Sequence, residues 1–84
     1  MTPDAIRHAL ELLEAFEREP SSANARHIAL WVQAVGAESH LDLVARRIAA
    51  GLLDFVAFHG LGQFERAARV ATEIRLTVAL ALAR

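Results

Sequence analysis

Residues 63–84 read QFERAARVATEIRLTVALALAR, and no other stretch of the chain repeats its apolar residues so regularly. Successive apolar positions are three or four residues apart, which is the spacing of one face of an α-helix. The positions that share this face are Phe64, Ala67, Ala71, Ile74, Val78 and Ala81. The spacing predicts a helix over residues 63–83.

The opposite side of this expected helix changes character along its length. Its first half carries Glu65, Arg69 and Thr72, whereas its second half carries Leu76 and Leu80. A helix that is apolar nearly all round in its last two turns is typically buried on more than one side. Either another helix of the same chain covers the two leucines, or they belong to a surface shared with a second chain. We expect the shared surface, most simply in a two-fold homodimer.

Three further helices are expected upstream, because the apolar residues there keep a helical spacing and Ala and Leu, with 18 and 12 copies, favour helix over strand. Short connections of about two to four residues make successive helices antiparallel. The sequence therefore predicts one all-α domain over residues 1–84, an antiparallel four-helix up-down bundle completed or doubled by dimerisation. The helices are expected at residues 3–19, 22–35, 39–59 and 63–83.

Capping residues and glycines suggest where these helices begin and end. Ser21 or Ser22 can accept a hydrogen bond at the start of the second helix. Gly36 is expected to end that helix as a C-cap glycine. Ser39 is expected to begin the third helix, with Asp42 completing an approximate capping box.

Charge is distributed unevenly between the two ends of the chain. The first twenty residues carry two Arg against five acidic residues, whereas residues 64–84 carry four Arg against two Glu. We therefore expect the first and last helices to lie side by side, either within one chain or across a dimer, although exposed ion pairs contribute only about 0–1 kcal/mol each.

Composition excludes several classes of function. The formal net charge is −1, so the electrostatic term that drives non-specific binding to nucleic acid is missing, and nucleic acid is not an expected partner. The chain has no Cys, which excludes disulfides and thiolate metal sites, and a cytoplasmic location is the default expectation. No apolar run approaches the roughly 20 residues that cross a bilayer, and no secretory signal is recognised. A membrane is therefore not an expected partner either.

Catalytic and metal-binding chemistry is not indicated. The chain has neither Cys, Lys nor Tyr, and its three serines stand where helices begin, so capping accounts for them. His8 and Glu11 have a spacing used in carboxylate-bridged bundles, but both fall on the charged side of the first helix. We therefore expect no enzyme activity, no metal and no cofactor. The histidines, each isolated in the sequence, are His8, His27, His40 and His59.

The remaining features favour a non-catalytic protein–protein interaction module, such as an adaptor, an assembly factor or a small inhibitor of a larger complex. Helix faces would pack on a protein partner, with apolar anchors giving affinity and an Arg/Glu rim giving specificity. Trp31 counts as an anchor only if it is exposed, since a buried Trp31 would be part of the core. The candidate interface residues are Trp31, Leu76, Leu80, Arg46, Arg47, Arg66 and Arg69.

A small helix-turn-helix DNA-binding regulator is the alternative. The second and third helices would form the motif around Gly36, with Arg46 and Arg47 reaching the DNA backbone. The two functions differ in one structural respect, because DNA binding requires both arginines to project together from an exposed convex face.

Overall fold

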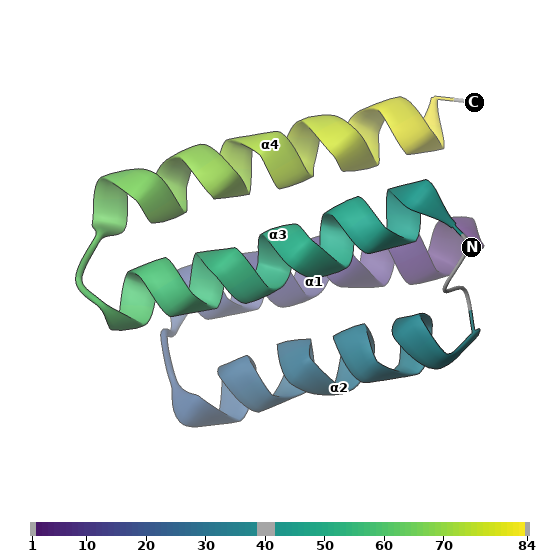
Figure 1. Cartoon of the computed structure of the whole chain (residues 1–84). Coiled ribbons are helices and arrows are strands. Elements are labelled where there is room, and N and C mark those ends of the chain that lie inside the picture. The colour runs from purple at the N-terminus through teal and green to yellow at the C-terminus, as the bar shows by residue number, and fades with distance from the viewer. Residues whose placement is uncertain (1, 39–41, 84) are drawn as a thin grey trace.

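The computed structural model describes residues 2–38 and 42–83, and every regular element in these residues is a helix. Figure 1 shows that the chain reverses direction from each helix to the next, so successive helices are antiparallel. This confirms the predicted all-α four-helix bundle. The helices are α1 (Pro3–Arg18), α2 (Ser22–Glu38), α3 (Leu43–Gly60) and α4 (Phe64–Leu82).

The helices are arranged as a square in chain order. α1 packs against α2 and α4, and α3 packs against the same two helices. α2 and α4 occupy opposite corners, and the described residues make no direct contact between them, as their separation in Figure 1 also shows. The pair α3 and α4 has the most extensive contact of all. The outer face of this pair therefore lies across the bundle from α2.

Side-chain caps begin three of the helices. The Oγ1 atom of Thr2 accepts a hydrogen bond from the Ala5 N–H, and the Oγ atom of Ser21 accepts one from the Asn24 N–H. The carboxylate of Asp42 accepts from two N–H groups in the first turn of α3. Each cap satisfies backbone donors that have no partner within the helix. The sequence left Ser21 and Ser22 as alternative caps of α2, and the structure shows that Ser21 has this role.

Two helix boundaries differ from those expected. Asp42 itself caps α3, so the helix begins at Leu43, and Ser39 lies outside the described residues. α2 continues through Gly36 to Glu38, and Gly36 does not have the positive φ of a C-cap glycine. The one positive φ in the described residues belongs to Gly62, whose φ of 75° closes the turn between α3 and α4. Gly62 therefore has the C-terminal role that Gly36 was expected to have.

A single apolar core runs along the middle of the bundle. Its residues recur three or four positions apart on α1, α3 and α4, as the sequence predicted. No polar or charged residue of the described chain is buried. The core residues are Ile6, Ala9, Leu13, Phe16, Ile28, Trp31, Ala45, Ile48, Leu52, Phe55, Ala67, Ala71, Ile74 and Val78.

Phe64 does not join this core, although it was expected on the buried face of the last helix. It is the first residue of α4 and is 60% exposed. Its ring packs edge-on against His59, with 4.9 Å between the ring centroids, and His59 in turn packs edge-on against the buried Phe16 at 5.1 Å. The last turn of α3 therefore separates Phe64 from the core.

α1 and α4 are joined by charge, as the uneven distribution of acidic and basic residues predicted. The guanidinium of Arg75 on α4 donates a hydrogen bond to the carboxylate of Glu17 on α1, within one chain. Both side chains remain partly exposed to water. Because the pair is partly exposed, it contributes little to the stability of the fold.

Gly51 lets α3 approach α4 closely. A Cβ atom built on this residue would lie 2.8 Å from Cγ1 and 3.2 Å from Cδ1 of Ile74. On α4, the buried residues Ala67 and Ala71 lie on the same face as Ile74 and also have small side chains. Small residues at a helix contact bring the two backbones together, and this pair of helices depends on them.

We expect Gly51→Ala to lower the free energy of unfolding by about 1 kcal/mol, because overpacking against Ile74 outweighs the gain in helix propensity. Gly36→Ala is the matched control. Gly36 is an exposed position of α2 with no atom within 4 Å of a built Cβ, so that substitution should raise the free energy by roughly 0.5 kcal/mol. Urea unfolding followed by circular dichroism measures both. Equal stabilisation by the two substitutions would contradict close packing at Gly51.

Candidate interaction surface

The leucines of α4 that the sequence singled out are exposed. Leu76 is 60% and Leu80 is 59% exposed, while the opposite side of the helix lies in the core. Leu43, in the first turn of α3, is 68% exposed. No other helix of the described chain covers these three leucines. The first explanation considered above, in which the fold of one chain buries Leu76 and Leu80, is therefore not what the structure shows.

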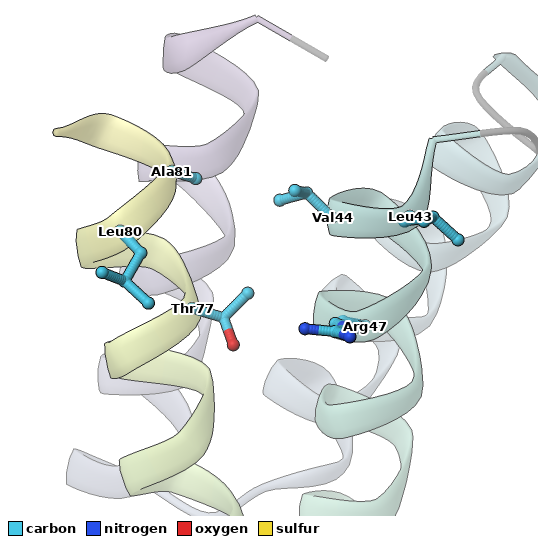
Figure 2. Close-up of a pocket in the computed structure, with 6 residues that line it drawn as sticks. All are labelled: Leu43, Val44, Arg47, Thr77, Leu80 and Ala81. Atoms are coloured by element: carbon cyan, nitrogen blue, oxygen red, sulfur yellow. The ribbon is translucent and has the colours of Figure 1, made fainter. Parts of the chain in front are cut away.

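Leu43 and Leu80 line the same hollow between α3 and α4, which encloses about 270 Å³. Figure 2 shows Val44 and Arg47 reaching from α3 towards α4, and Thr77 pointing back towards α3. Apolar side chains make up most of this wall, with Arg47 as its charged member. The six lining residues are Leu43, Val44, Arg47, Thr77, Leu80 and Ala81.

A second hollow continues from the first along the same pair of helices. Arg47 and Thr77 line both hollows, so the two form one groove. The second hollow adds charged residues, Asp54 of α3 and Glu73 of α4. We call this feature the α3/α4 groove. It consists of Leu43, Val44, Arg47, Ala50, Gly51 and Asp54 of α3, and Val70, Glu73, Ile74, Leu76, Thr77, Leu80 and Ala81 of α4.

The charged side chains around the groove have no opposite charge bound to them. Arg47, Asp54 and Glu73 are not part of any ion pair among the described residues, and the same holds for Arg69, on the outer line of α4. All of them are exposed. The groove therefore has a mainly apolar end with Leu43 and Leu80, and a charged end where Leu76 shares the hollow with Asp54 and Glu73.

The four candidate arginines do not form one patch. Arg46 and Arg47 are exposed, but consecutive residues of a helix point about 100° apart, so Arg46 points away from the groove. The guanidinium of Arg66 lies 5.8 Å from the ring centroid of Phe58 and donates to the side chain of Gln63 at 3.3 Å. Arg47, Arg66 and Arg69 thus lie around the α3/α4 face, and Arg46 lies outside it.

This geometry does not favour the helix-turn-helix alternative. Arg46 and Arg47 diverge instead of projecting together. α2 and α3 lie side by side in opposite directions in Figure 1, with no recognition helix set across the other. Glu73 and Asp54 also add negative charge beside Arg47. DNA binding is therefore not proposed for this chain.

Trp31 is a core residue and not an exposed anchor. Only 7% of it is exposed, and its indole N–H donates a hydrogen bond to the carbonyl oxygen of Ala5 at 3.2 Å. The hydrogen bond to Ala5 places the indole against α1, so the condition for an exposed anchor is not met. Trp31 is therefore removed from the set of candidate surface anchors.

We expect Trp31→Ala to lower the free energy of unfolding by about 3–5 kcal/mol, because it empties a site in the core. Trp31→Phe keeps most of the ring and should cost only about 1–2 kcal/mol, mainly through the lost indole hydrogen bond. Denaturant unfolding followed by circular dichroism measures both. Unchanged stability of Trp31→Ala would show that the ring is not packed between α1 and α2.

The histidines offer little chemistry in this fold. Nδ1 of His8 lies 3.6 Å from Oε2 of Glu11, and both side chains are well exposed on the outside of α1. Among the described residues, no group of three or more His, Asp or Glu side chains comes close enough to hold a metal ion. His40 lies outside the described residues.

A separate apolar hollow, outside the α3/α4 groove, lies between α1 and α2. Leu30, which is 53% exposed, lines it together with Leu12 and the edge of Trp31. His8 and His27 stand at its rim. It exposes one large apolar side chain where the α3/α4 groove exposes three, so the groove is the stronger candidate surface.

Sequence reasoning identified Leu76, Leu80, Arg47 and Arg69 but did not connect them with Leu43 and Asp54. The pattern that could have done so is the recurrence at positions 43, 47, 50 and 54, which marks one outer line of α3.

None of the described helices is both long enough and apolar enough to cross a membrane. Comparison with protein-family models, curated proteins and solved structures finds no match to this chain.

Proposed function

We propose that this chain is a non-catalytic protein-interaction module that binds its partner in the α3/α4 groove. The observation that carries the proposal is the exposure of three leucines along a single groove, with Leu43 and Leu80 in its first hollow and Leu76 in its second. Apolar patches of this kind on a small protein mark contact surfaces for other proteins. The module would act as an adaptor, an assembly factor or a small inhibitor, in the cytoplasm.

The leucines would supply most of the affinity. Burying a fully exposed leucine stabilises a complex by roughly 1.5–3 kcal/mol, and each of these side chains still exposes more than half of its surface. The charged residues beside the groove would act mainly on partner choice, because rim charges affect specificity and association rate more than affinity. The partner therefore presents apolar side chains flanked by charges of both signs.

We expect the double substitution Leu76→Glu with Leu80→Glu to abolish binding, because it places two carboxylates where a partner would bury apolar surface. The chain should stay folded, since both side chains point to water in the monomer. Light scattering measures self-association, and affinity capture from the native host measures binding to other proteins. Circular dichroism checks the fold.

Leu30→Glu is the matched control, because Leu30 has similar exposure but lies on α2, across the bundle. It should leave both measurements unchanged. Loss of the same partners with Leu30→Glu, or retention of every partner by the double variant, would contradict binding at the α3/α4 groove.

A further inference from the structure

We propose that the partner in the α3/α4 groove is a second copy of this chain, related to the first by a two-fold axis that runs parallel to α3 and α4. This inference rests on the proposed function and adds the identity and orientation of the partner. It follows from the order in which apolar and charged residues occur along the two helices.

One shared hollow and two close approaches show which residues of α3 and α4 lie at similar heights along the groove. Val44 and Leu80 line one hollow at its leucine end. In the middle, Gly51 lies against Ile74. At the far end, Arg66 lies over the ring of Phe58. Heights between these points follow from the regular rise of the two antiparallel helices.

The apolar residues of the two helices match in height. Leu80 of α4 lies at the height of Leu43 and Val44 of α3, and Leu76 lies between the heights of Arg47 and Ala50. A two-fold axis parallel to the helices places α4 of one copy on α3 of the other without changing heights. Leu80 of each copy then meets Leu43 of the other, and Leu76 meets Ala50 and the aliphatic part of Arg47.

The charged residues match in the same arrangement. Asp54 shares its hollow with Val70, so it lies at the height of Arg69, the neighbour of Val70 on the outer line of α4. The two-fold axis brings Asp54 of each copy opposite Arg69 of the other. Arg47 of each copy can also reach Glu73 of the other, about one helical turn away. None of these charges has an ion-pair partner among residues 2–38 and 42–83 of its own chain.

A two-fold axis perpendicular to the helices does not give this match, because it inverts the heights. If the axis brought the leucines of both copies together, Asp54 and Arg69 would extend past the end of the partner. The two Arg47 side chains would then lie close to each other. If the axis instead paired the charges, Leu80 would face the charged end of the other groove. The parallel axis alone satisfies both sets of residues.

The size of the surface also suits a second copy. The bundle measures 33 × 22 × 19 Å, so one long face is comparable with the roughly 800 Å² that each partner buries in a stable protein–protein interface. In the dimer α3, α4 and their copies would form a further four-helix bundle in which neighbouring helices are antiparallel, as they are within the chain.

The decisive experiment mixes two charge variants, Asp54→Arg and Arg69→Glu. Each alone places like charges opposite each other twice, so each should dimerise roughly tenfold or more weakly than the unmodified chain. Mixed in equal amounts, they restore two opposite-charge pairs between chains and should form a heterodimer of near-normal affinity. Sedimentation equilibrium measures the association constants. Arg46→Glu, a control on the outer side of α3 away from the groove, should dimerise normally.

Orientation is tested by disulfide formation between single-cysteine variants, since the chain has no cysteine of its own. A mixture of Leu43→Cys and Leu80→Cys should oxidise to a cross-linked heterodimer, whereas Leu30→Cys with Leu80→Cys should not. This readout does not depend on the charge variants. Absence of the first cross-link, or failure of the two charge variants to rescue each other, would overturn the proposal.

A wild-type chain that stays monomeric at millimolar concentration would also overturn this inference. The proposed function would stand in that case if the Leu76→Glu and Leu80→Glu double variant still lost a different protein that the unmodified chain captures. If the double variant lost no partner of any kind, both proposals would be overturned.

Discussion

The close packing of α3 on α4 is the constraint from which the surface of this protein follows. The missing side chain of Gly51 leaves space for the side chain of Ile74, and the small buried residues Ala67 and Ala71 follow on the same face of α4. Two helices packed this closely share a common outer face, because the residues that flank the contact on each helix point to the same side of the pair. That shared face carries the α3/α4 groove.

Three of the large apolar residues that this small chain exposes line the α3/α4 groove. A domain of this length buries only about 60–65% of the surface that its unfolded chain exposes, so its core is thin. The described core contains four residues each from α1, α3 and α4 but only two from α2. Leu43, Leu76 and Leu80 add nothing to the core in one chain, and a partner seated on the groove would let them contribute to stability.

Part of this structure could be predicted from the sequence because periodicity is a local property of a helix. The spacing of Ala67, Ala71, Ile74 and Val78 is enough to identify the buried face of α4. Boundaries were harder, because Ser39 and Asp42 are both good caps and the sequence does not say which one the chain uses. The burial of Trp31 escaped prediction because it depends on α1, not on the pattern of α2.

The sequence by itself determined the number and type of the helices, most of the buried faces of α1, α3 and α4, and the excess of apolar residues at the end of α4. The tertiary structure alone decided that Leu43 and Leu80 line one hollow and that Asp54 and Val70 line another. The physical reason is that hydrophobic spacing fixes how a helix is rotated towards the core but not how far it slides along its neighbour. That sliding is set by the fit of Gly51 against Ile74, a contact between residues far apart in the chain.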